Sequence, residues 1–144
     1  MCDECTAGLR RLAAWAARVV VENVPRPDVA CLVAVPAEPD RKLRRGYHAA
    51  ERLTLELATA WELSALPLLA RSRGSPRQRE LTRVQRRRNV VSAFACSGSV
   101  PAQVTLVDDV YTTGATANAA ASALRKGGAR RVQVVTFART IRIR

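Results

Sequence analysis

Residues 104–116, VTLVDDVYTTGAT, form the stretch that decides the fold. It opens with the apolar run from Val104 to Val107, and a continuous run of this kind predicts a strand covered on both faces of a parallel sheet. Residues 108–114 are predicted to form the loop after this strand. The alanine-rich range from Ala115 to Lys126 is followed by two glycines and predicts a helix that ends there. The stretch therefore predicts a strand, a loop and a helix in direct succession.

The rest of the chain repeats this alternation of apolar strands and helices. Apolar residues at helical spacing predict helices over residues 7–23 and 50–61. Apolar runs predict further strands over residues 29–35, 65–70, 90–95 and 131–137. The predicted fold class is α/β, a Rossmann-like three-layer arrangement in which right-handed crossovers place helices on both faces of a parallel sheet. The length of 144 residues fits a single domain over residues 1–144.

The loop after the deciding strand has the chemistry of an anion site. Ligands bind at the carboxyl ends of strands in open α/β sheets. Backbone N–H groups at a helix start attract a phosphate, and Gly114 would let the backbone approach it closely. Asp108 and Asp109 suit hydrogen bonds to two neighbouring hydroxyls, such as those of a ribose. The predicted phosphate site consists of Tyr111, Thr112, Thr113, Gly114, Ala115 and Thr116.

A structural explanation of the same residues is an acidic turn with a threonine that caps the helix. The repulsion between two adjacent carboxylates argues against it, because a purely structural loop gains nothing from that repulsion. A site for a phosphate and a diol is the favoured interpretation.

The charge of the chain points to anionic partners. The sequence holds 24 Lys plus Arg against 12 Asp plus Glu, a formal net charge of +12. Residues 71–88 are rich in arginine, and one guanidinium can bind two oxygens of the same phosphate. A phosphorylated metabolite or a nucleic acid is therefore the expected partner. The longest apolar stretch, residues 12–21, contains Arg18 and is too short to span a bilayer. No membrane contact is expected. Because the first residues do not resemble a secretory signal, a cytoplasmic location is expected.

Four cysteines are expected to be free thiols. A metal site would require four ligands, and Cys2 and Cys5 have the spacing of a zinc knuckle without a second pair further along the chain. Metal binding within this chain is therefore not expected.

The quoted residues resemble a known family. VTLVDDVYTTGAT resembles the phosphoribosyl pyrophosphate (PRPP) signature of type I phosphoribosyltransferases. Other stretches resemble the ComF-like subfamily, which is associated with competence and is amidophosphoribosyltransferase-like. These stretches are VP at 35–36, RRGY at 44–47, QxxLT at 78–82, RxxNV at 86–90, AF at 93–94 and TFAR at 136–139. The resemblance covers about residues 28–139.

The resemblance implies an enzyme that uses PRPP with Mg²⁺. Such an enzyme moves ribose 5-phosphate to a nitrogen acceptor, which the sequence does not identify, and releases pyrophosphate. Asp108 and Asp109 would be the catalytic pair that holds the ribose hydroxyls, and residues 111–116 would bind the 5-phosphate. The pyrophosphate would lie against Pro36, Arg41, Arg44 and Arg45. Arg73, Arg77 and Gln78 would belong to a flexible loop that closes over the substrate. Mg²⁺ would arrive with PRPP, and no residue is assigned as its direct ligand.

Two alternatives remain open at this point. The same pocket could serve a non-catalytic sensor of PRPP or a nucleotide, or residues 71–88 could bind nucleic acid. His48 and Ala49 stand where the subfamily usually has Asn and Gln, which points to an altered acceptor side, although His48 is expected to be an exposed polar residue and not a base. Residues 1–7 are interpreted as a possible remnant of a zinc ribbon. Trp15 and Trp61 are expected in the core or in an interface, so an oligomer is possible.

Overall fold

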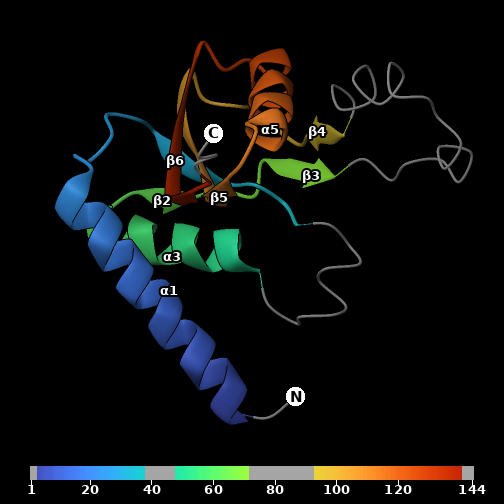
Figure 1. The fold of residues 1–144 in the computed structure, drawn as a ribbon. Coiled ribbons are helices and arrows are strands. Elements are labelled where there is room, and N and C mark those ends of the chain that lie inside the picture. The colour runs from blue at the N-terminus through green and yellow to red at the C-terminus, as the bar shows by residue number, and fades with distance from the viewer. Residues whose placement is uncertain (1–2, 38–47, 72–92, 141–144) are drawn as a thin grey trace, which may run out of the picture.

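The computed structural model describes residues 3–37, 48–71 and 93–140. Figure 1 shows its elements in space, and their bounds follow in chain order. They are α1 (Asp3–Asn23), β1 (Cys31–Ala34), α3 (Ala49–Trp61), β2 (Ser64–Ala65), β3 (Leu69–Arg71), β4 (Phe94–Cys96), β5 (Gln103–Tyr111), α5 (Ala115–Lys126) and β6 (Arg131–Arg139).

The main sheet is parallel, as predicted. Its strand order is β2-β1-β5-β6, and every neighbouring pair in it runs parallel. The register places Leu106 of β5 between Val33 of β1 and Val134 of β6. Strands β3 and β4 form a separate antiparallel pair. The order of the main sheet puts the carboxyl ends of β1 and β5 side by side, where ligands bind in this class of sheet.

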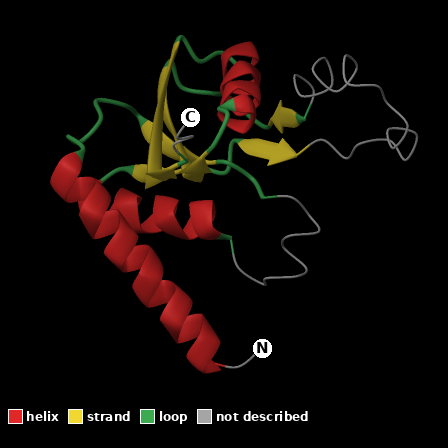
Figure 2. Ribbon diagram, in the orientation of Figure 1, coloured by secondary structure: helices red, strands yellow, loops and turns green. Residues whose placement is uncertain are grey.

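Helices cover both faces of the main sheet, so the predicted three layers are present. Helix α5 packs on one face together with the β3–β4 pair, and α1 and α3 pack on the other (Figure 2). Leu106 and Leu124 belong to the core on the α5 side, whereas Leu32 and Leu57 belong to the core on the opposite side. All four side chains are fully buried, and each such burial contributes about 1.5–3 kcal/mol to folding.

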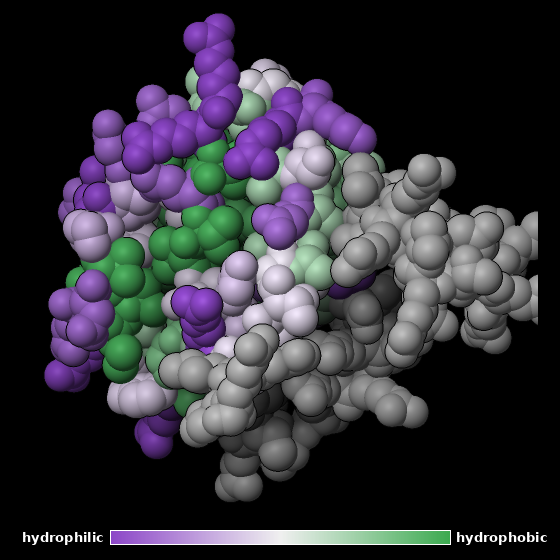
Figure 3. Space-filling view, turned by 45° about the horizontal axis from the view of Figure 1, so that its top comes forward, coloured by the Kyte–Doolittle hydropathy of each residue, from purple (hydrophilic) through white to green (hydrophobic). Residues whose placement is uncertain are grey.

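Among its described side chains, helix α1 packs mainly through small residues and leaves larger apolar ones exposed. Ala13, Ala16 and Ala17 are buried against the neighbouring elements, but Leu12 and Trp15 are more than half exposed. The Trp15 ring contacts Phe137 edge to face at 5.5 Å. Figure 3 shows a patch of apolar side chains bordered by hydrophilic ones on the face that it draws. Trp61, in contrast, is buried in the core as expected.

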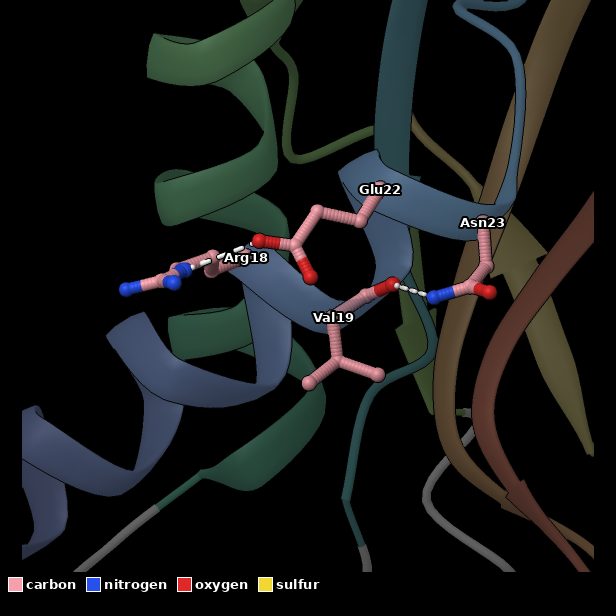
Figure 4. A network of polar contacts seen from close by, with 4 residues as sticks. All are labelled: Arg18, Val19, Glu22 and Asn23. Atoms are coloured by element: carbon pink, nitrogen blue, oxygen red, sulfur yellow. Dashed lines mark hydrogen bonds and ion pairs between the residues drawn. The ribbon is translucent and has the colours of Figure 1, made fainter.

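The end of α1 is fixed by side chains close to it in sequence. Asn23 donates a side-chain hydrogen bond to the carbonyl of Val19, one turn earlier, at 2.8 Å (Figure 4). Arg18 and Glu22 form an exposed ion pair one turn apart, with 2.9 Å between Nε and Oε1. Pro25 follows and cannot extend the helix. Within the described residues no helix has the length and apolar character that a bilayer crossing requires.

The structure differs from the predicted elements at two places that matter for the site. Strand β5 continues through Asp108 and Asp109 to Tyr111, so these residues lie in a strand and not in the predicted loop. The reason is that β6 continues beside them, with Asp108 in register with Thr136. The predicted strand over residues 65–70 is in fact two short strands in different sheets, separated by Pro67, which lacks an N–H for a sheet ladder.

Candidate functional site

The two acids lie near the carboxyl end of β5, and the backbone orients their side chains. The N–H of Asp109 donates to Oδ1 of Asp108 at 2.9 Å, and the N–H of Val110 donates to Oδ1 of Asp109 at 3.0 Å. Both acids are half-buried. The pair is therefore held by the strand itself and remains partly open to a ligand.

The electrostatics of the pair disfavour two negative charges. Burial raises the pKa of Asp108 to about 6, and the hydrogen bond and charge of the Asp109 side chain act in the same direction. The backbone N–H of Asp109 and the positive charge of Arg71 lower the pKa of Asp108 but do not outweigh these causes. Hydroxyl donors or a cation beside the pair would stabilise the charged form.

The loop from Thr112 to Gly114 leads directly into α5 and leaves the helix start open. Gly114 has φ +76° and is buried, and a Cβ at this position would lie 2.7 Å from Cζ of Tyr111. No side chain caps α5, although Thr113 Oγ1 accepts a long hydrogen bond of 3.4 Å from the N–H of Ala115. Thr112, Thr113 and Thr116 are exposed. This arrangement presents N–H groups and hydroxyls to an anion.

Tyr111 forms a wall of this loop. Its ring packs against the core on the α5 side and abuts Gly114. The guanidinium of Arg139, its register partner on β6, lies 5.8 Å from the centre of the ring. The ring thus lies between the loop glycine and a positive charge.

Arg71 is a site residue that the sequence reasoning did not single out. Its Nε donates to the carbonyl of Pro36 at 3.0 Å, and its guanidinium lies 4.8 Å from the centre of the Phe94 ring. Its charge also acts on Asp108. Arg71 therefore connects the end of β1 with the acid pair on β5. The available signal was its position at the end of an apolar run, which places it in a strand at the start of the arginine-rich residues 71–88.

Several predicted site residues lie outside the described residues. Pro36 is described and follows β1. The remaining predicted pyrophosphate and flexible-loop residues are not: Arg41, Arg44, Arg45, Arg73, Arg77 and Gln78. Cys2, the side chain of Cys5 and most of residues 71–88 also lie outside. Cys31 and Cys96 are free, and burial raises the pKa of both thiols, so they stay protonated near neutral pH.

A pocket with a volume of about 400 Å³ lies where β1 and β2 end and α3 begins. His48, which immediately precedes α3, lines it. The His48 side chain is only 16% exposed, which corrects the expectation of an exposed histidine. Its Nδ1 lies 3.5 Å from Oε2 of Glu51, and its buried Nε2 has no hydrogen-bond partner among the described residues. A buried polar atom of this kind calls for an explanation.

The described residues supply too few metal ligands to hold Mg²⁺ alone, but they could bind an ion that a phosphate ligand also holds. In residues 3–37, 48–71 and 93–140 no group of three or more His, Cys, Asp or Glu side chains could hold a metal ion. Asp108 and Asp109 supply carboxylate oxygens, and Mg²⁺ is commonly bound by one or two carboxylates plus substrate phosphates. The pair suits an ion that arrives with a diphosphate.

The chain matches proteins of competence and DNA utilization in sequence. It is 35% identical to competence protein F of Haemophilus influenzae, 33% to DNA utilization protein YhgH of Salmonella typhi and 32% to competence protein ComFC of Streptococcus pneumoniae. These matches cover 75%, 90% and 74% of this chain but 49%, 61% and 47% of the relatives. The chain thus spans about half the length of the curated relatives that it matches. No protein-family model matches it.

The fold matches solved enzymes more broadly. The allosteric regulatory enzyme of purine biosynthesis superimposes with a TM-score of 0.62 at 19% identity, over 90% of this chain and 25% of that chain. Glutamine PRPP amidotransferase from B. subtilis gives a TM-score of 0.60 at 16% identity, over 90% of this chain and 26% of that chain. The fold is that of the type I phosphoribosyltransferases. Within this class the chain is a ComF-like family member, related to the competence and DNA utilization proteins.

Proposed function

We propose that the chain binds PRPP at the carboxyl edge of its main sheet and transfers ribose 5-phosphate to a nitrogen acceptor, with release of pyrophosphate. One observation carries the proposal. A half-buried acid pair lies near the end of β5, and the chain then passes through Gly114 into the start of α5, which no side chain caps. The acid pair suits the sugar hydroxyls, and the helix start suits the phosphate on the same sugar.

In this proposal, different residues bind different parts of PRPP. Asp108 and Asp109 accept hydrogen bonds from the ribose hydroxyls. Residues 111–116 bind the 5-phosphate through backbone N–H groups and threonine hydroxyls. Pro36 begins the segment that faces the pyrophosphate, and Arg41, Arg44 and Arg45 of the same segment provide positive charge for it. Arg73, Arg77 and Gln78 belong to the loop that closes over the ligand and excludes water.

The transfer forms a bond between the acceptor nitrogen and C1 of the ribose while the bond from C1 to the pyrophosphate oxygen breaks. The bonding electrons leave with the pyrophosphate, on which negative charge builds, and the proton lost by the acceptor nitrogen passes to the departing pyrophosphate or to solvent. The positive charges of Arg41, Arg44 and Arg45 would stabilise that charge. Mg²⁺ bound together with PRPP would neutralise further charge on the phosphate oxygens.

Thermal unfolding with PRPP, with and without Mg²⁺, tests the assigned site. We expect Mg²⁺-dependent stabilisation of the wild type, by about 2.7 kcal/mol at a ligand concentration of 100 Kd. The double variant Asp108→Asn/Asp109→Asn should lose it. Asp28→Asn, which changes an exposed acid elsewhere on the chain, is the matched control and should keep it. Equal stabilisation of the double variant would contradict the assigned contacts to the sugar.

A sensor of PRPP or a nucleotide on the same pocket is the second candidate, and pyrophosphate release separates it from the enzyme. A protein that binds PRPP with Mg²⁺ but releases no pyrophosphate with a panel of nitrogen acceptors is a sensor. Nucleic acid is a further candidate partner, favoured by the arginine-rich residues 71–88 and by relatives named for DNA utilization. If it binds there, affinity should fall steeply with salt, and neutralising Arg86, Arg87 and Arg88 should flatten that dependence.

A further inference from the structure

We propose that the outer edge of β6 is a docking site for an extended segment of another polypeptide, which joins the main sheet as a further strand. The segment carries acidic residues at both ends of an apolar run. The inference is independent of the proposed function, because strand addition at β6 requires no ligand at the acid pair or at the start of α5.

Strand β6 leaves one side of its backbone without a strand partner. It lies at the end of the order β2-β1-β5-β6, and among the described residues it pairs with β5 alone. The N–H of Arg131 donates to the carbonyl of Ala102, which precedes β5, at 2.9 Å. Because the direction of backbone groups alternates along a strand, the N–H and C=O groups of Val132, Val134 and Thr136 point away from β5. These groups are a template for one more strand.

The edge lacks most of the features that usually prevent strand addition. Edge strands are commonly short, or they contain proline or lysine. The opposite edge of the sheet, β2, is only two residues long. Strand β6 has nine residues, with no proline and with no charged residue between its terminal arginines. Because strands usually have about 5–6 residues, this edge is long enough to hold a complete partner strand.

Apolar side chains flank the edge on both faces of the sheet. Val132 packs against the core on the α5 side, and Val134, two residues further on the same face, is 42% exposed. On the opposite face the Trp15 ring of α1 contacts Phe137 and is 55% exposed. An added strand would cover apolar surface on both faces, so a run of apolar and β-branched residues fits it best.

The arginines at the two ends of β6 select the partner. If two copies of β6 paired antiparallel along their full length, Arg131 of each copy would face Arg139 of the other. Like charges directly opposite each other destabilise a strand pair, and the +12 charge of each chain adds to the repulsion. Among the described residues neither arginine forms an ion pair. A different polypeptide with acidic ends would supply an opposite charge to both.

Isothermal titration of the full chain with two synthetic peptides tests the inference. The probe is a nine-residue peptide with Asp at both ends and alternating Val and Thr between them, and the matched peptide has Lys at both ends. The acidic peptide should bind and the basic one should not. This difference should shrink as salt is added, because both ends of the edge are exposed to solvent.

Two substitutions separate the backbone from the charge. Val134→Pro removes an outward N–H at a position where an edge strand tolerates proline, so it should weaken binding by about tenfold or more. Val134→Thr keeps that N–H and is its matched control, with a much smaller loss. Arg131→Glu should reverse the preference between the two peptides. Arg52→Glu, on α3, makes the same charge change away from β6 and should not reverse it.

Hydrogen exchange provides a second readout that does not depend on the variants. In the free chain, the amides of Val132, Val134 and Thr136 should exchange faster than those of Gln133 and Val135, which point toward β5. Binding of the acidic peptide should slow the exchange of the first three. Unchanged exchange of these amides at saturating peptide would overturn strand addition.

Failure of the acidic peptide to bind also overturns the proposal, as does equal binding of the two peptides. Binding that Val134→Pro leaves unchanged, in a variant that still unfolds cooperatively, has the same consequence. Concentration-dependent dimerisation of the wild type, measured by analytical ultracentrifugation and abolished by Val134→Pro, would assign the edge to a second copy of the chain and overturn the acidic partner.

Discussion

The backbone N–H of Asp109 donates a 2.9 Å hydrogen bond to the carboxylate of Asp108, so the second acid of the pair orients the first. This bond favours the charged form of Asp108. Burial, and after it the side chain of Asp109, acts more strongly in the opposite direction and raises the pKa of Asp108 to about 6. The ligand-free pair thus stores an unfavourable interaction that a bound sugar or cation would remove.

The raised pKa of Asp108 makes the stability of the free protein depend on pH. The folded state binds the Asp108 proton more tightly than the unfolded state, so this contribution is complete below the unfolded pKa near 4 and is lost as pH rises through about 6. We expect Asp108→Asn to be more stable than the wild type at pH 7.5 by about 1 kcal/mol, after allowance for solvent screening of a half-exposed group.

Urea unfolding of the wild type and Asp108→Asn across this pH range is the measurement. The difference in the free energy of unfolding should shrink toward zero at pH 4, while Asp28→Asn should show no such trend. A difference that stays constant with pH would show that the charge of Asp108 is not its origin.

Gly114→Ala should disturb the loop that we propose binds the phosphate. The backbone at this position has φ +76°, which costs a residue with a Cβ about 1–2 kcal/mol, and the added carbon would also collide with the Tyr111 ring. We expect a loss of stability of at least about 1–2 kcal/mol, together with weaker binding of PRPP. Gly8→Ala is the control, because nothing lies within 4 Å of its Cβ position and alanine favours its helix. Similar effects of the two changes on stability would contradict the local conformation described for Gly114.

Arg71→Gln should raise the pKa of Asp108 further. The change removes a positive charge that now lowers this pKa, as well as the cation that lies over Phe94. Carboxyl-carbon NMR titration of Asp108 measures the shift directly. Arg71→Lys keeps a charge without the planar fork, so it should keep more of the wild-type pKa than Arg71→Gln does. An unchanged pKa in Arg71→Gln would exclude the proposed electrostatic link.

Leu124→Ala should destabilise the fold, because it removes a buried side chain of α5. Leu124 is fully buried on α5, and removal of such a side chain typically costs about 2–5 kcal/mol. Leu12→Ala, at a position 53% exposed on α1, should cost about 0.5 kcal/mol or less. Chemical denaturation of both variants distinguishes these outcomes, and equal losses would contradict the burial described for the two helices.

The sequence was most informative where the determinants are local. The bounds of α5 agree with those predicted, because a glycine precedes the helix and two glycines follow it. The end of β5 was misplaced because consecutive aspartates are poor strand residues, and only their pairing with β6 keeps them extended. No local pattern signals that pairing.

The site was predictable where one segment supplies it and hidden where several segments meet. The acid pair and the glycine loop follow one another in the sequence, so their proximity could be predicted. His48 lines the same pocket as residues 65–69, and the role of Arg71 depends on its hydrogen bond to Pro36, 35 positions away. Such contacts follow from the packing of α3 and β3 and not from any periodicity.

Asp108 pairs with β6 and directly follows the residues of β5 that are paired with both β1 and β6, so the proposed sugar contacts lie next to the centre of the sheet. Amide hydrogens in the centre of β5 should be among the last to exchange with deuterated water, since they open only with the whole fold. The acids would then keep their geometry at temperatures where the surrounding loops have already begun to fluctuate, and loss of the site would coincide with global melting.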